Sequence, residues 1–314
     1  MRYAGGFSAC YLLLAAILFA PRIYAADAVL SIGDSKGVYQ ALMKGAGELD
    51  GVPYRVEWAE FPATAPALEA LAAGAIDLRA SAAAPLIFAL AAGAQIKAVA
   101  ALRLDGKREM DAILVLPNSP LHAAADLRGK KIGTNKGSVG HHLVLAALQH
   151  EHIPFDAVSI QFLLPADVRA ALLNGSVDAW STWDPYVSIA EVQDRLRPIV
   201  DGSDLPMTDG VLVASSASIA SKRAFLQDFI GRLARAQSWA RRNPRDYAAL
   251  YSRQTGLSME VSDLLVRHMS YDYVPIDDAI VRNHQQVADL YLQAGVIRQN
   301  VEMSRAFDRS VFPQ

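Results

Sequence analysis

The sequence contains the pattern Ile-Gly-x-x-Lys-Gly twice, beginning at Ile32 and at Ile132, so the two copies lie 100 residues apart. A second pair of segments, 71–77 and 172–178, repeats at almost the same offset. Two ordered blocks at one offset indicate that one architecture is used twice in the chain. The sequence therefore predicts two similar lobes.

Strand-like and helix-like segments alternate along most of the chain. Strands are expected at 29–33, 54–58, 76–79, 131–133, 158–162 and 177–180. This rhythm predicts an α/β fold in which each lobe is a mixed, mostly parallel sheet flanked by helices. Crossings of the chain near 115 and 210 would assign 26–115 and 211–314 to lobe 1 and 116–210 to lobe 2. Two crossings make a two-strand hinge.

Residues 1–25 have the pattern of a secretory signal peptide. Arg2 gives a positive start, 11–20 form a short apolar run, and Ala25 is a small residue at the expected cleavage site. The run is too short to span a bilayer. We therefore expect export and a periplasmic location.

Cleavage at that site would remove Cys10, the one cysteine of the sequence. The mature chain would then have no disulfide, no thiolate nucleophile and no cysteine ligand for a metal. Removing Arg2 and Arg22 as well leaves 28 basic and 32 acidic residues, a formal charge of −4. This charge argues against a nucleic-acid partner.

Each copy of the repeat predicts a strand that runs into a turn and then opens a helix. Helix N-termini carry free backbone N–H groups, so two of them facing a shared cleft would bind a small anion. Such a site needs several donors and no general base. The expected donors are Ser35, Ser81, Ala82, Gly137 and Ser138.

Other candidate contacts have two readings each. Lys36 and Lys136 either reach the anion or are solvated turn residues, and the repeat favours both or neither. Arg79 is either a ligand guanidinium or a salt-bridge partner. Asp209 either lines the cleft or makes a turn.

The segment 183–186 is expected to form one wall of the cleft. Trp183 would pack on the apolar part of a ligand, and Asp184 would cap a helix that begins at Pro185. Tyr186 would contribute packing or its hydroxyl.

Three blocks carry a resemblance to a known family: 56–62 (Val-Glu-Trp-Ala-Glu-Phe-Pro), 133–142, and 162–167 followed by 180–186 (Trp-Ser-Thr-Trp-Asp-Pro-Tyr). They resemble the solute-binding proteins of ABC importers for aliphatic sulfonates and related oxyanions, within the wider nitrate, taurine and thiamine-precursor binding group. The resemblance implies a type II periplasmic-binding-protein fold that closes on its ligand and presents it to a membrane permease. It also implies that His141 approaches the ligand. We expect the protein to act as a monomer.

One loop departs from the family. The family's loop after the third strand commonly reads Thr-Gly-Glu/Asp-x-Pro-Pro, whereas residues 80–85 read Ala-Ser-Ala-Ala-Ala-Pro. A ligand amine read by that acid would lose its partner. An alternative ligand is therefore a pyrimidine or another neutral or cationic solute, read by Trp183, Asp184 and Asp209.

Catalysis and metal binding have less support. Relatives of this two-lobed scaffold include desulfinases and pyrimidine-synthesising enzymes, which use a cysteine or a cofactor-bound lysine, so an enzyme on the same fold is the second alternative. His141-His142 and His150-x-His152 lack the i, i+4 spacing that brings two ligands together. We expect no enzyme, no cofactor and no metal, but a binding protein for an aliphatic sulfonate or related small oxyanion.

Overall fold

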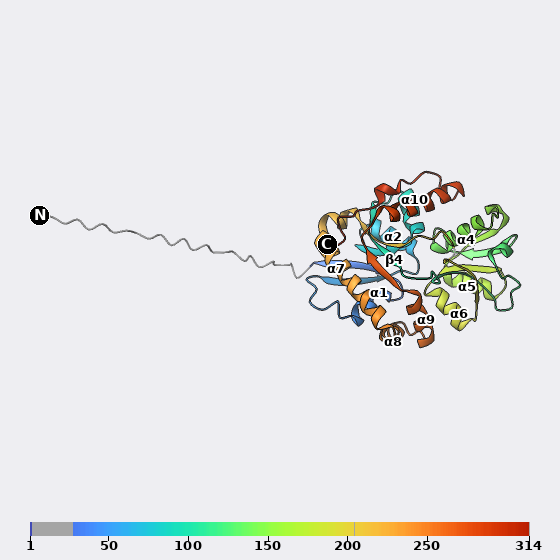
Figure 1. Cartoon of the computed structure of the whole chain (residues 1–314), viewed down its shortest axis with the longest axis horizontal. Helices are drawn as coiled ribbons and strands as arrows, with labels where there is room; N and C mark the ends of the chain where they lie inside the picture. The colour runs from blue at the N-terminus through green and yellow to red at the C-terminus, as the bar shows by residue number, and fades with distance from the viewer. Residues whose placement is uncertain (2–27, 204, 314) are drawn as a thin grey trace.

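The computed structural model describes residue 1 and residues 28–203 and 205–313. The predicted signal peptide, apart from Met1, lies outside the described residues. The described part is an α/β protein with two sheets, each flanked by helices (Figure 1). The predicted fold class is confirmed.

Lobe 1 is the part of the chain built on a six-stranded sheet of order β11-β4-β10-β3-β1-β2. Three of its strands, β1, β2 and β3, are parallel, whereas β10 and β11 run antiparallel to β4. The strands are β1 (Val29–Asp34), β2 (Arg55–Glu60), β3 (Leu78–Ser81), β4 (Ile96–Leu104), β10 (Gly210–Ser215) and β11 (Tyr271–Val274).

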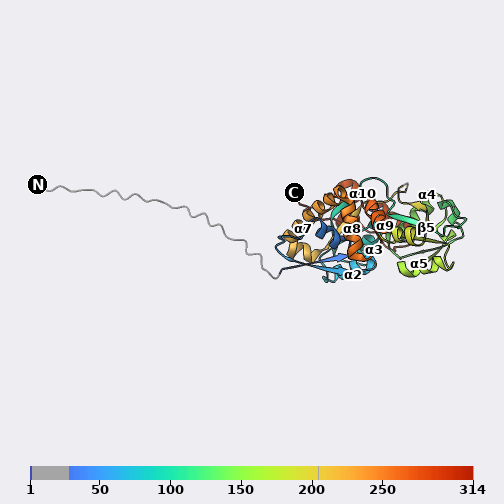
Figure 2. The same ribbon diagram turned by 90° about the horizontal axis from the view of Figure 1, so that it is seen from below.

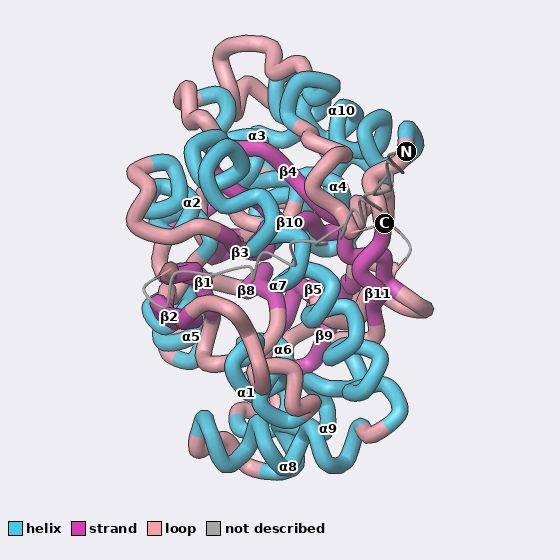
Figure 3. Tube along the Cα trace, turned by 90° about the vertical axis from the view of Figure 1, so that its left-hand side faces the viewer, coloured by secondary structure: helices cyan, strands magenta, loops and turns pink. Residues whose placement is uncertain are grey.

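Helices cover this sheet in two groups, α1, α8 and α9 towards one end and α2, α3 and α10 towards the other (Figure 3). The long helix α7 packs in the same core as α1 and α8. The helices of lobe 1 are α1 (Val38–Gly45), α2 (Thr64–Ala72), α3 (Ala83–Ala91), α7 (Ser216–Arg242), α8 (Pro244–Thr255), α9 (Met259–His268) and α10 (Asp278–Gln293).

Lobe 2 is the part built on a five-stranded sheet of order β7-β6-β8-β5-β9. Its strands are β5 (Asp111–Val115), β6 (Lys131–Thr134), β7 (Ser159–Phe162), β8 (Ala179–Trp183) and β9 (Arg197–Asp201). Its helices are α4 (Val139–His150), α5 (Pro165–Leu173) and α6 (Tyr186–Gln193). Short 3-10 turns lie at Ala124–Leu127 and Phe155–Ala157 in this lobe. A further 3-10 turn lies at Met303–Ala306 near the C-terminus.

The predicted duplication is present in the strand order. β1 pairs in parallel with β2 and β3, and β6 pairs in the same way with β7 and β8. The repeated Ile-Gly-x-x-Lys-Gly segment begins in β1 or β6 and ends just before α1 or α4. Each copy therefore leads from the carboxyl end of a central strand into a helix.

The first crossing between the sheets lies earlier than predicted. β5 pairs with β8 and β9, so Asp111–Val115 belongs to the sheet of lobe 2. The chain crosses between Leu104 and Asp111, and Gly106 has a φ of 102° there. The turn-rich segment 117–120, which suggested a break, lies within lobe 2.

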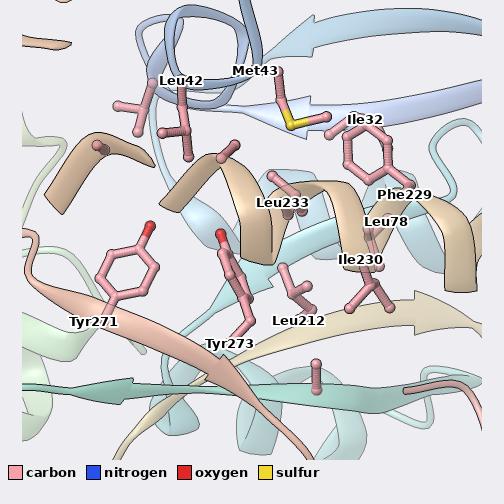
Figure 4. Close-up of a cluster of buried hydrophobic side chains, with 14 of the residues drawn as sticks. Ile32, Leu42, Met43, Leu78, Leu212, Phe229, Ile230, Leu233, Tyr271 and Tyr273 are labelled. Atoms are coloured by element: carbon pink, nitrogen blue, oxygen red, sulfur yellow. The ribbon is translucent and has the colours of Figure 1, made fainter. Parts of the chain in front are cut away.

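The core of lobe 1 explains why the long helix α7 forms. Its apolar residues recur every three or four positions, so one face of the helix can be buried. Figure 4 shows Phe229, Ile230 and Leu233 of this face packed near Ile32 and Leu78 of the sheet. Burying each such side chain contributes about 1.5–3 kcal/mol.

The described helices give no candidate for a membrane span, because none combines sufficient length with sufficient apolar character. Figure 2 shows α9 of lobe 1 beside lobe 2, where it packs against α6. The lobes thus contact each other directly as well as through the two crossings.

Candidate functional site

A cavity of about 200 Å³ lies between the lobes. Both sheets contribute to its walls, and the two hinge crossings contribute Arg108, Met110 and Thr208. Its polar lining residues are Asp34, Ser35, Thr64, Arg79, Ser81, Arg108, Asp111, Ser138, Asp184 and Thr208.

The cation of lobe 1 in this cavity is Arg79, at the second position of β3. It is buried, and its Nη1 donates to the backbone oxygen of Asp34 at 3.0 Å while its Nη2 donates to Ser35 Oγ at 3.0 Å. Within the described residues its Nε has no hydrogen-bond partner. Burial lowers the pKa of Arg79, but a guanidinium stays charged at neutral pH. The cavity wall thus holds a fixed positive charge.

Gly33 makes room for this guanidinium stem. A Cβ at Gly33 would lie 2.7 Å from Ile76 Cδ1 and 3.1 Å from Arg79 Cδ. The glycine of the first repeat copy therefore serves the packing of the arginine.

The expectation of an open helix N-terminus in the first repeat copy is wrong. Asp34 Oδ1 accepts from the backbone N–H groups of Ser35 (2.7 Å) and Tyr39 (3.1 Å), and its Oδ2 accepts from Gln40 at 3.0 Å. A side-chain anion thus already occupies the N-terminus of α1. Burial raises the pKa of Asp34, although these three backbone donors oppose the shift.

The second copy remains open to the cavity. Ser138 lines the cavity and also caps α4, since its Oγ accepts from the His141 N–H at 3.1 Å and donates to Asn135 O at 2.6 Å. In lobe 1, Ala82 precedes α3 and lines the same cavity together with Ser81, whose hydroxyl donates to Ala82 O at 2.8 Å. Two helix N-termini, one from each lobe, therefore open onto one cavity, which favours an anion.

The two turn lysines do not line the cavity. Lys36 is exposed in a left-handed backbone conformation with φ of 49°. Lys136 is also exposed, with its Nζ 5.9 Å from the ring centroid of Phe162. The turn directs both ammonium groups to solvent, so the repeat favours neither as a ligand contact.

Gly137 and His141 also lie outside the cavity, in an apolar contact between the lobes. Gly137 adopts φ of 72° and its N–H donates to His141 Nδ1 at 3.3 Å. The His141 ring stacks on Tyr291 of α10 at 5.9 Å and lies 6.4 Å from Phe88 of α3. Burial lowers the pKa of His141 to about 4, so the ring is neutral at neutral pH.

The wall formed by 183–186 lines the cavity only in part. Trp183 and Asp184 line it, and the Trp183 ring meets the Tyr186 ring edge-on at 5.7 Å. The Tyr186 hydroxyl instead donates to Pro62 O of lobe 1 at 3.0 Å, so Tyr186 bridges the lobes. Asp184 Oδ1 accepts from the N–H (2.9 Å) and hydroxyl (2.6 Å) of Ser188 in the first turn of α6.

Sequence reasoning missed Arg108 and Asp111, at the first hinge crossing. Arg108 Nη1 lies 3.6 Å from Asp111 Oδ2, and its stem covers Gly202 of the second crossing. Burial raises the pKa of Asp111 to about 6, opposed by Arg108 and reinforced by Asp184. Neither residue lies in a motif, so only the folded hinge reveals them.

Asp209 lies beside the cavity without lining it. Its carboxylate is 3.6 Å from Arg103 Nε, while its neighbours Thr208 and Gly210 line the cavity. In the described part of the chain, no group of three His, Cys, Asp or Glu side chains is arranged to hold a metal ion.

Apolar and aromatic side chains form much of the remaining wall. One group of them comes from α1, β4, the first crossing, the C-terminal end of α9 and the start of β11. A ligand with a charged head and an apolar tail fits a wall of this composition. The residues are Val38, Tyr39, Leu102, Leu104, Met110, Leu265, Met269 and Tyr271.

Comparison with known proteins gives a consistent result. The NMT1/THI5-like family model matches residues 54–247. A curated protein of Escherichia coli (strain K12), named as a candidate aliphatic sulfonates-binding protein, is 34% identical over 295 residues and aligns 93% of this chain with 92% of its own length.

Two solved structures agree with it. The periplasmic aliphatic sulphonate binding protein SsuA from Escherichia coli is 33% identical with a TM-score of 0.81, covering 90% of this chain and 92% of that one. The alkanesulfonate-binding protein SsuA from Xanthomonas axonopodis pv. citri, solved bound to MOPS, is 30% identical with a TM-score of 0.84, covering 91% and 99%. The desulfurization enzyme DSZB, at 17% identity and a TM-score of 0.65 over 90% and 97%, shares the fold alone.

Proposed function

Because the chain belongs to the NMT1/THI5-like family, we propose that it is an extracytoplasmic solute-binding protein of an ABC importer. Its interlobe cavity would bind an aliphatic sulfonate or a related small monoanion and deliver it to a permease. The similar proteins whose names state a role at 30% identity or more are binding proteins, which favours this role over catalysis.

The observation that carries the proposal is the position of Arg79. Its buried guanidinium lies on the same cavity as the N-termini of α3 and α4, at Ala82 and Ser138. A sulfonate has one negative charge spread over three oxygens, so it can accept from a guanidinium and from backbone N–H groups together. The side chains that define the site are already held in place, which reduces the ordering cost of binding.

The apolar part of the cavity would hold the ligand's tail. Trp183 of lobe 2 faces the same cavity as Val38 and Leu104 of lobe 1. A ligand that touches both walls stabilises the arrangement in which the lobes are together, because only that arrangement offers both sets of contacts. We further propose that the protein acts as a monomer and that its lobes divide as the two sheets do.

Calorimetric titration of residues 26–314 tests the proposal. The ligands are unbranched alkanesulfonates of one to eight carbons, taurine, sulfate, nitrate and a thiamine-type pyrimidine. We expect one-to-one binding of the sulfonates, with affinity rising up to about fourfold for each added methylene, which corresponds to about 0.8 kcal/mol. Heat with the pyrimidine and none with any anion would refute it. The buried Asp111 makes that outcome the alternative to test, since its carboxylate favours a donor-bearing solute.

A further inference from the structure

A buried ion pair joins the two lobes beside the cavity. His268 ends α9 of lobe 1, and its Nδ1 lies 2.6 Å from Oδ2 of Asp184, which follows β8 of lobe 2. The two side chains are 5% and 2% exposed. Asp184 and its neighbour Trp183 line the cavity, whereas His268 does not.

The carboxylate of this pair is held from both sides. The backbone N–H and the hydroxyl of Ser188 donate to Asp184 Oδ1, while the His268 ring is hydrogen-bonded to Asp184 Oδ2. The position of Asp184, and of the adjacent Trp183, thus depends on contacts within lobe 2 and on one contact from lobe 1. That one contact exists only when the lobes lie together.

The charged groups that face His268 from its neighbours are acidic. His268 Nε2 lies 3.9 Å from Glu109 Oε2 of the first hinge crossing. The negative charges of Glu191 of α6 and of Asp184 also favour a protonated His268 ring. Burial by itself lowers the pKa of His268, but the hydrogen bond to Asp184 and the charges of Asp184, Glu191 and Glu109 outweigh it, so the pKa is raised. The imidazolium form is therefore favoured while the lobes are together.

We propose that His268 is a positioning residue for ligand binding. In its imidazolium form it holds Asp184 and Trp183 against lobe 1, and this contact stabilises the ligand-binding arrangement of the lobes. This inference rests on the proposed function. Separation of the lobes would expose both partners to water and remove the contact, so the pair favours one state over the other.

The sign of the pH effect follows from this arrangement. With the lobes apart, the pKa of His268 returns towards the ordinary value of about 6.5. Bringing the lobes together therefore takes up a proton between that value and the raised one. The contribution of His268 to ligand affinity is fully present below about pH 6.5 and is lost as the pH rises through the raised pKa.

The first experiment measures the Kd for hexanesulfonate from pH 5.5 to pH 9 in the wild-type protein and in His268→Gln, which keeps a hydrogen-bonding side chain without the charge. We expect wild-type affinity to fall at higher pH, by up to about tenfold for each unit by which the pKa is raised. His268→Gln should bind weakly at low pH and lack this fall. A His268→Gln profile that matches the wild-type one would overturn the proposal.

Two further variants separate this effect from others. Asp184→Asn, nearly isosteric, should remove the same pH step. Asp111→Asn removes the titration expected near pH 6 from the cavity, so it should leave the higher step unchanged. If Asp111→Asn instead removes the whole pH dependence, His268 is not the titrating group.

A ligand-free measurement keeps this inference distinct from the function. Residues 28–203 and 205–313 contain no cysteine, so spin labels can be placed at Glu69→Cys on α2 of lobe 1 and Ala166→Cys on α5 of lobe 2, two exposed sites. We expect the interlobe distance to lengthen between pH 6 and pH 9 in the wild-type protein but not in His268→Gln. An unchanged wild-type distance overturns the positioning role, whereas absence of sulfonate binding at every pH refutes the proposed function.

Discussion

Replacing Arg79 with methionine removes the cavity's buried cation while keeping most of its stem. A hydrogen bond to a charged group is worth about 1.5–3 kcal/mol, so loss of one such bond to a sulfonate should weaken binding by about 10- to 150-fold. Arg79 also donates to Asp34 O and Ser35 Oγ, and these acceptors would lose their partner. We therefore expect a lower melting temperature as well, with a folded protein at 25 °C.

Calorimetry with hexanesulfonate measures the affinity, and circular dichroism measures the fold and the melting temperature. Arg103→Met is the matched control, because Arg103 lies on β4 of the same sheet, is half exposed and pairs with Asp277 at 2.8 Å outside the cavity. The control should bind within about twofold of wild type, since exposed ion pairs contribute little. A folded Arg79→Met protein that also binds within twofold of wild type would refute the assignment of Arg79 to the anion.

Three other predictions concern the cavity and the lobe contact. Burial raises the pKa of Asp111 from 3.8 to about 6, so the free energy of unfolding should fall by about 2 kcal/mol between pH 4 and pH 8 on this account; urea unfolding of Asp111→Asn should show a smaller fall, and an equal fall would contradict the shift. Trp183→Ala should weaken binding of a six-carbon sulfonate about tenfold more than that of methanesulfonate in calorimetry, because the tail loses apolar contact; equal losses would place the tail elsewhere. Gly137→Ala and Gly129→Ala both place a side chain at positive φ, at a cost of about 1–2 kcal/mol each. Only the Cβ at Gly137 would also meet another side chain, Phe88, at 3.0 Å. Urea unfolding should therefore show a larger loss of stability for Gly137→Ala, and equal losses would show that the Phe88 contact adds no strain.

The fold was predictable because its signals are local and repeated. The segment at Ile32 and its copy at Ile132 begin in equivalent strands of two sheets, as the spacing predicts. The boundary at 115 was misplaced because a proline-rich turn such as 117–120 reads as a linker whether it lies between lobes or within one. Pairing of β5 with β8 joins residues about 70 positions apart, and no local pattern encodes it.

The predicted residues that line the cavity come from local signals: helix N-termini for three of them, and the strand-to-helix segment that contains Trp183 and Asp184. Ser81, Ala82 and Ser138 line the cavity because they precede or open helices at the ends of central strands. Arg108 and Asp111 do so because two crossings lie side by side, which is a tertiary fact. The direction of the two turn lysines was also hidden, since the repeated pattern does not state whether its lysine faces the cleft or solvent, and both are exposed.

The carboxylate of Asp34 at the start of α1 makes the two halves of the repeat inequivalent. A cleft with two matching open helix ends would accept a small anion in either of two orientations. Here the carboxylate of Asp34 already accepts from N–H groups at the start of α1, so an anion bound as proposed would meet the open end of α4 and the guanidinium of Arg79 instead. A fold built by duplication thus presents two unlike helix ends at equivalent positions of its two lobes.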